Sequence, residues 1–202
     1  KILNKLFDSV IRLANTIRDS TQISKDVLSL GDVALNLIEE KVGLDAKKKV
    51  LLIGTGESAA MVAKTLGQKE ISFTVTSKNM ERATNFSQLL CGTPMEFSDV
   101  LAGFDKFDII ILATTADYFV IDLEQIKLVM KEKKKGTLIL DISEPRAVEE
   151  TIMELPRIKL LFRDQVAEIY EENARLRAGI VPAVEKIIDK ELPILSASMK
   201  RA

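Results

Sequence analysis

After Lys49 the sequence alternates between short apolar runs and amphipathic segments, and this alternation restricts the possible folds more than any other feature of the chain. The apolar runs, which we expect to be strands, are residues 50–53, 73–76, 109–113, 138–142 and 158–162. The helical segments between them are residues 57–66, 80–90 and 123–133. Continuous apolar strands that alternate with amphipathic helices are typical of a parallel sheet with both faces covered. The sequence therefore predicts an α/β domain with a doubly wound parallel sheet.

The segments on either side of this alternation are expected to be helical. Apolar residues recur at helical spacing over residues 2–17. A second helix is expected from about Ser29 to Lys41, with Ser29 or an earlier polar residue as its cap. Beyond Asp164 the helical pattern returns, and Pro182 is expected to kink this helix or to start a new one. The final helix has nothing of the α/β domain left to cover, so its apolar stripe is expected to pack on another subunit or a further domain. The fold class is thus an α/β domain with helical N- and C-terminal extensions.

The composition argues against several classes of function. A formal net charge of −1 over 202 residues does not indicate broad electrostatic binding to nucleic acid or anionic lipid. No apolar run is long enough to span a bilayer, so a cytoplasmic protein without membrane contact fits best. The chain has no histidine, the commonest metal ligand and general base, and we expect no metal site. Its single cysteine, Cys91, is not expected to be a catalytic nucleophile, because no histidine is present to activate it. A small buried thiol is the commoner role of a lone cysteine and is the one expected here.

The stretch VLLIGTGESAAMVAKTL, residues 50–66, has the layout of a turn that holds a dinucleotide pyrophosphate. Gly54 permits a tight turn, Gly56 lets the backbone approach the phosphates, and Ala59 stands where the helix packs on the strand. The helix N-terminus adds free amides and the positive end of its dipole. The expected pyrophosphate contacts are Gly54, Thr55, Gly56, Glu57, Ser58 and Ala59. The alternative is a glycine turn that serves packing alone.

The end of the second expected strand, in VTSKNMER, bears on which dinucleotide is bound. A site for NAD usually has an acidic residue about twenty positions after the glycine turn, to hold the ribose hydroxyls. Here no carboxylate ends the strand. Lys78 and Arg82 can instead neutralise a 2′-phosphate, while Ser77 and Asn79 donate hydrogen bonds, which favours NADPH. The alternative is a polar turn with a solvated lysine.

Two later strand ends supply further candidates. The stretch ATTA ends a strand at the edge where the nicotinamide half should lie, so Thr114, Thr115 and Ala116 are expected to contact the ribose or the nicotinamide amide. Packing of small residues is the alternative. Asp141 ends the next strand at a similar depth, and its carboxylate is as well suited to cap the following loop as to contact ligand.

Several blocks, in order, resemble the glutamyl-tRNA reductase family. They are the segment LFDSVIRLANTIRDSTQISKDVLSLGDVAL with Ile23, Ser24, Val27 and Ser29, then VLLIGTGESAAMVAKTL, SKNMERA, DIIILATTA, LILDISEPRAVEE and DQVAEIYEENARLR. The fifth contains the family's Asp-Ile-x-x-Pro-Arg at Asp141, Ile142, Pro145 and Arg146. Two blocks depart from the family pattern. Ala59 replaces the last glycine, and Ser77, Lys78 and Asn79 replace an Asn-Arg-Thr triplet.

This resemblance implies a Rossmann-type, NADP-binding domain at residues 29–163. Residues 1–28 would be the helical tail of an N-terminal catalytic domain, and residues 164–202 the linker helix that leads into a dimerisation domain. In such enzymes a cysteine of the catalytic domain, expected upstream of Lys1, forms a thioester with the glutamyl group of glutamyl-tRNA. Hydride from NADPH then gives glutamate-1-semialdehyde for tetrapyrrole (porphyrin) biosynthesis. No catalytic residue is then expected in this chain, which alone would be inactive.

The same resemblance implies partners. The full protein would bind glutamyl-tRNA through its catalytic domain, form a homodimer through its C-terminal helices, and contact the next enzyme of the tetrapyrrole pathway. Two other functions remain open. One is a dehydrogenase module similar to shikimate dehydrogenase or to a siroheme-pathway enzyme. The other is a regulatory domain that senses NAD(P) and dimerises through its terminal helices.

Overall fold

A computed structural model describes residues 2–21, 23, 29–130 and 135–200 of the chain. The chain divides into two compact units, one comprising Ser29–Tyr170 and the other Lys1–Leu28 with Glu171–Ala202. Residues 131–133 of an expected helix, and Ser24 and Val27 of the first family block, lie outside the described residues.

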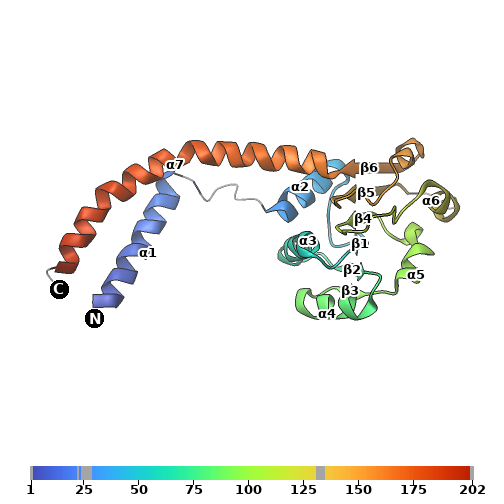
Figure 1. The fold of residues 1–202 in the computed structure, drawn as a ribbon, viewed down its shortest axis with the longest axis horizontal. Helices are drawn as coiled ribbons and strands as arrows, with labels where there is room; N and C mark the ends of the chain where they lie inside the picture. Colours follow the sequence, from blue (N-terminus) through green and yellow to red (C-terminus); the bar gives the residue numbers. More distant parts are fainter. Residues whose placement is uncertain (1, 22, 24–28, 131–134, 201–202) are drawn as a thin grey trace. The chain divides into compact units, whose positions relative to one another are not determined.

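The first unit is built on a six-stranded sheet (Figure 1). Its strands are β1 (Val50–Ile53), β2 (Phe73–Thr76), β3 (Thr93–Pro94), β4 (Ile109–Leu112), β5 (Thr137–Asp141) and β6 (Ile158–Phe162). They lie in the order β3-β2-β1-β4-β5-β6, and every neighbouring pair is parallel. The doubly wound, Rossmann-type sheet predicted from the sequence is thereby confirmed. The two-residue β3 was not predicted, because it is too short to show a period and contains Pro94.

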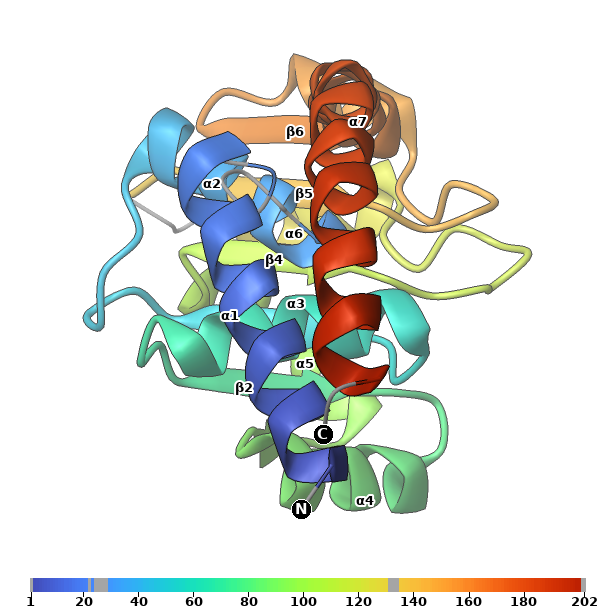
Figure 2. The ribbon, with the colours of Figure 1, turned by 90° about the vertical axis from the view of Figure 1, so that its left-hand side faces the viewer.

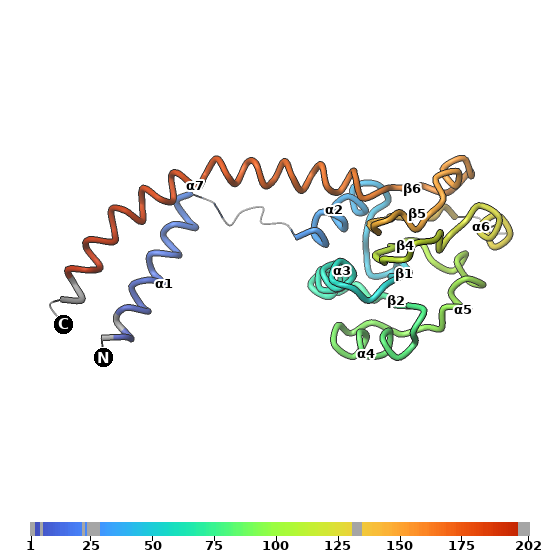
Figure 3. The backbone as a smooth tube through the Cα atoms, in the orientation of Figure 1, coloured from blue at the N-terminus to red at the C-terminus, as the bar shows by residue number. Residues whose placement is uncertain are grey.

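Helices cover both faces of the sheet, as the tube in Figure 3 shows. These elements are α2 (Leu30–Val42), α3 (Glu57–Gln68), α4 (Met80–Leu90), α5 (Phe97–Leu101) and α6 (Leu123–Met130), with 3-10 turns η1 (Phe104–Lys106) and η2 (Glu150–Glu154). One buried cluster joins Ile53 and Leu112 of the sheet to Phe104 of η1 and Ile126 of α6. All residues of β1 and β4 are buried, which explains why these strands read as unbroken apolar runs.

On the other face α2 packs closely on α3. A Cβ at Gly31 would lie 2.4 Å from the carbonyl oxygen of Met61, so this position requires glycine. Of the two alternatives for the cap of α2, the structure has Ser29, and Asp32 completes a capping box with it. Asp32 also accepts a hydrogen bond from Thr65 Oγ1 at 2.8 Å, which ties the start of α2 to α3.

The second unit contains α1 (Ile2–Thr21) and the part of α7 (Arg163–Lys200) beyond Tyr170. Figure 2 shows these two segments running side by side in opposite directions. Pro182 and Pro193 both lie inside α7, so the expectation that Pro182 starts a new helix is wrong. Part of the α7 stripe, including Ile187 and Leu195, lines a groove together with residues of α1. None of the helices within the described ranges is long and apolar enough to cross a membrane.

Candidate cofactor site

A cavity of about 670 Å³ lies at the carboxyl ends of β1, β2 and β4. Its volume is in the range of small-molecule and cofactor sites. In the sheet, β2 and β3 lie on one side of β1, and β4, β5 and β6 lie on the other. The carboxyl end of β1 is therefore the topological switch point, where open α/β sheets bind their ligands. Of the residues expected to bind cofactor, the structure brings together at the cavity Gly54, Thr55, Gly56, Ser77, Lys78, Asn79, Arg82, Thr114, Thr115 and Ala116.

The two glycines of the turn after β1 have different environments. Gly54 has a φ of 123°, and a Cβ there would lie 2.1 Å from the carbonyl oxygen of Ala113 at the end of β4. Its N–H donates to the carbonyl oxygen of Thr76 at 2.9 Å, which joins the turn to β2. A Cβ at Gly56 would meet nothing within 4 Å. Gly54 is thus needed for close packing of the strands, whereas Gly56 leaves space free at the cavity.

The N-terminus of α3 differs from those of α2 and α4. Ser29 and Asn79 cap α2 and α4 with their side chains, but Gly56, the N-cap of α3, has no side chain to accept a hydrogen bond. The first amides of α3 are therefore suited to an anionic ligand. Together with the open space at Gly56, this uncapped helix end fits the shape and charge of a pyrophosphate. Glu57, Ser58 and Ala59 are outside the cavity lining, and Ala59 is fully buried, consistent with helix packing.

At the end of β2, Ser77 and Asn79 shape the turn that leads into α4. Ser77 Oγ donates to the carbonyl oxygen of Asn79 at 2.6 Å, and Asn79 Oδ1 accepts from the Arg82 N–H at 3.2 Å. Lys78 and Arg82 are exposed, and within the described part of the chain neither has a carboxylate at ion-pair distance. This end of the cavity therefore carries uncompensated positive charge.

At the end of β4, two hydrogen bonds hold the ATTA stretch in place. The Thr114 N–H donates to Ser143 Oγ at 3.2 Å, and the Ala116 N–H donates to Thr114 Oγ1 at 3.3 Å. Two residues further on, Tyr118 lines the cavity, and its ring centroid lies 4.2 Å from Lys78 Nζ. Sequence reasoning missed Tyr118, for which the only signal was an aromatic residue close behind a candidate binding loop.

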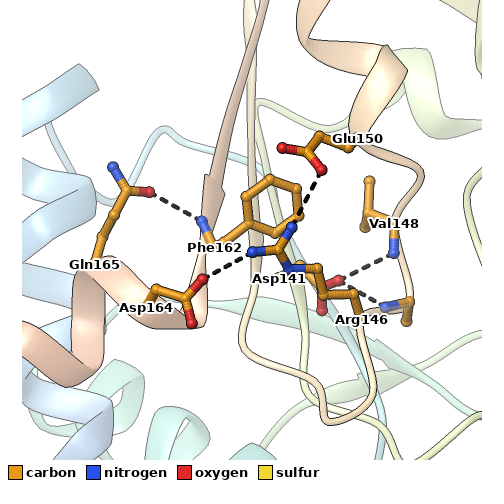
Figure 4. A network of polar contacts seen from close by, with 8 residues as sticks. Asp141, Arg146, Val148, Glu150, Phe162, Asp164 and Gln165 are labelled. Atoms are coloured by element: carbon orange, nitrogen blue, oxygen red, sulfur yellow. Dashed lines mark hydrogen bonds and ion pairs between the residues drawn. The ribbon is translucent and has the colours of Figure 1, made fainter.

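Asp141 is fully buried and does not line the cavity. Its Oδ1 accepts from the Ser143 N–H at 2.9 Å, and its Oδ2 accepts from the N–H groups of Ala147 and Val148 at 2.7 and 3.0 Å. Figure 4 shows the Oδ2 contacts. Of the two roles considered for Asp141, the geometry is that of a loop cap.

Arg146 connects the same loop to the beginning of α7 (Figure 4). Its guanidinium contacts Asp164 at 2.8 Å and Glu150 at 3.3 Å, and it lies 4.2 Å above the ring of Phe162. The neighbouring Arg163 pairs with Glu144. The blocks LILDISEPRAVEE and DQVAEIYEENARLR are therefore physically joined by these contacts, which we call the Arg146 latch.

Cys91 is exposed at the end of α4, so the expectation of a buried thiol is wrong. The reason is local: Cys91 adopts a left-handed conformation, with φ of 58°, that ends the helix at the surface. Among the residues described, no group of three or more histidine, cysteine or acidic side chains is placed to hold a metal ion.

Comparison with known proteins decides the family. The sequence profile of the family described as "Shikimate / quinate 5-dehydrogenase" matches residues 36–169, which lie within the α/β unit. The chain belongs to this family. One solved structure with the same fold is a shikimate dehydrogenase in complex with NADP+. The match covers 80% of this chain and 61% of the shikimate dehydrogenase, with a TM-score of 0.53 and 19% identity.

The curated relatives that match the helical extensions as well include several glutamyl-tRNA reductases. The curated glutamyl-tRNA reductase of Cenarchaeum symbiosum is 41% identical over 199 residues. The match covers 98% of this chain and 48% of the relative. The solved glutamyl-tRNA reductase from Methanopyrus kandleri has a TM-score of 0.80 and 28% identity, covering 100% of this chain and 51% of its own. The resemblance inferred from the sequence is thereby confirmed. This family member spans about half the length of the curated relatives that it matches.

Proposed function

We propose that this chain is the NADPH-binding part of a glutamyl-tRNA reductase, which reduces the glutamyl group of glutamyl-tRNA to glutamate-1-semialdehyde for tetrapyrrole biosynthesis. One observation carries the choice of cofactor. The cavity is lined by the open glycine turn and by two exposed cations, Lys78 and Arg82. These cations lie at the strand end where NAD sites have a carboxylate. The similarity of the whole chain to glutamyl-tRNA reductases supports the choice of reaction.

In this proposal each side of the cavity has its own role. The open backbone at Gly56 and the first amides of α3 bind the pyrophosphate. Lys78 and Arg82 bind the 2′-phosphate, and Thr114 and Thr115 contact the nicotinamide half. When bound, the reduced nicotinamide supplies hydride. The chain's own residues bind and orient that group, and no catalytic side chain is assigned among them.

The domain assignments made from the sequence belong to the same proposal. Residues 29–163 bind the cofactor, and residues 1–28 and 164–202 connect this domain to the parts of the enzyme that react with glutamyl-tRNA and form a homodimer. In this proposal the full protein also contacts the next enzyme of the tetrapyrrole pathway. The thioester-forming cysteine is assigned to the catalytic domain, because Cys91 does not line the cavity.

Calorimetric titration of the 202-residue chain with NADPH, and separately with NADH, tests the proposal. We expect tighter binding of NADPH. Lys78→Glu should weaken NADPH binding about tenfold or more, because a charge-assisted contact to phosphate is replaced by repulsion. NADH binding should change little.

The matched control is Lys64→Glu, which makes the same charge change on α3 at an exposed position outside the cavity lining. It should leave both affinities nearly unchanged. Failure of either nucleotide to bind at millimolar concentration would contradict the proposal, as would equal effects of the two substitutions.

A further inference from the structure

Lys78 and Tyr118 approach each other from two strands that are not neighbours. Lys78 follows β2 and Tyr118 follows β4, and β1 lies between these strands in the sheet. The contact of 4.2 Å between Lys78 Nζ and the Tyr118 ring therefore connects the two sides of the switch point next to the Gly54–Gly56 turn. Both side chains line the cavity.

This contact changes what Lys78 can do as a binding group. A lysine side chain is a flexible four-carbon stem that loses rotamer entropy when it is immobilised. A cation above an aromatic face is stabilised by the ring quadrupole, even at exposed sites. An ammonium has three N–H donors, so contact with the ring leaves donors for a phosphate. Because no carboxylate among the described residues pairs with Lys78, the ring is the group that holds its charge at the cavity.

We propose that Tyr118 is a positioning residue for recognition of the ribose 2′-phosphate. Its ring holds the Lys78 ammonium at the cavity before the nucleotide binds, so that less side-chain freedom is lost on binding. Tyr118 thereby determines the preference between a 2′-phosphorylated and an unphosphorylated dinucleotide. This inference rests on the proposed binding of NADPH.

A structural role for the ring would have a different effect. Phe86, Leu89 and Phe97 also line the cavity, and they offer apolar surface to any nucleotide. If Tyr118 were only one more part of that wall, its loss would weaken NADPH and NADH equally. The ratio of the two affinities therefore separates positioning of Lys78 from packing against the ligand.

The test is a set of calorimetric titrations with NADPH, NADH, adenosine 2′,5′-bisphosphate and adenosine 5′-monophosphate. Tyr118→Leu should reduce the preference for the phosphorylated member of each pair about three- to fivefold. Tyr118→Phe should keep the preference, because it keeps the ring. Phe119→Leu is the control, since Phe119 is exposed and does not line the cavity.

A double-mutant cycle gives the decisive readout. In a Lys78→Met background, Tyr118→Leu should no longer change the preference, because the cation that it positions is gone. A persisting effect in that background, or an equal loss for both members of each pair, would overturn the proposal. Thermal unfolding of each variant shows whether it is folded.

The two proposals fail in different ways. If the unmodified chain binds neither dinucleotide, the proposed function fails and the role of Tyr118 fails with it. If it prefers NADPH and Tyr118→Leu leaves that preference unchanged, only the role of Tyr118 is wrong.

Discussion

At the scale of single residues, Gly54 and Gly56 meet two different physical requirements within one turn. Gly54 adopts a φ that L side chains rarely reach and faces the backbone of Ala113 at a distance that admits no Cβ. Gly56 has an ordinary φ of −85° and open space where a Cβ would be. The same residue type thus serves the fold at one position and leaves room for a ligand at the other.

Substituting each glycine by alanine should separate these roles. Gly54→Ala should lower the free energy of unfolding by at least about 2 kcal/mol, because backbone strain and a close contact add. Gly56→Ala should lower it by no more than about 1 kcal/mol, the difference between glycine and alanine at an N-cap, yet should weaken NADPH binding. Urea denaturation and calorimetry measure the two effects. Equal losses of stability would contradict this explanation.

At the scale of elements, Asp32 stabilises both the start of α2 and its contact with α3. One carboxylate oxygen accepts from Ser29 N at 2.7 Å and from Ser29 Oγ at 2.8 Å, and the other accepts from Thr65 Oγ1. Burial raises the pKa of this carboxyl, but the hydrogen bonds from Ser29 and Thr65 and the charge of Lys69 outweigh it and lower the pKa below its usual range. The ionised form is therefore the one that stabilises the folded state.

We expect Asp32→Asn to lower the free energy of unfolding by about 1 kcal/mol at pH 7, because hydrogen bonds to a charged carboxylate are replaced by weaker ones to a neutral amide. Because the folded pKa is depressed, the contribution of Asp32 is present above the unfolded pKa of about 4 and is lost as the pH falls through the folded value. The difference between the two proteins should thus shrink below pH 4 in denaturation measured against pH. Asp189→Asn on the exposed part of α7 is the control. A difference independent of pH would contradict the assignment.

At the scale of the whole molecule, the Arg146 latch holds the beginning of α7 to the loop after β5. α7 begins in the α/β unit and continues as part of the other unit, so its first turn is where the chain leaves the sheet. The ion pairs of the latch are exposed and each stabilises little, and the position of Arg146 above the ring of Phe162 adds a cation–π contact. The expected effect of breaking the latch is therefore local.

Arg146→Ala should increase hydrogen exchange of the amides in residues 163–170 about fivefold, which corresponds to about 1 kcal/mol of local stability. NADPH affinity should be unchanged, because Arg146 does not line the cavity. Arg175→Ala, which removes an exposed arginine further along α7, should leave exchange at residues 163–170 as it was. An exchange rate unaffected by Arg146→Ala would show that the latch does not stabilise this turn.

The sequence by itself determined the strands other than β3, the α-helices other than α5, and the position of the glycine turn. The strands at residues 50–53, 73–76 and 158–162 and the helix at residues 80–90 have the predicted bounds, because apolar periodicity and capping act within a few residues along the chain. The parallel sheet followed from the alternation of these elements, and with it the edge at which a ligand site would lie.

Only the tertiary structure decided which side chains meet at that edge. The contact of Lys78 with Tyr118 joins residues forty positions apart across β1, and the exclusion of a Cβ at Gly31 or Gly54 depends on a neighbouring element's backbone. Asp141 could equally have faced ligand or loop until the path of residues 143–148 placed three N–H groups on its carboxylate. Local patterns contain no information on such contacts, because these arise from the distances between elements once the sheet has assembled.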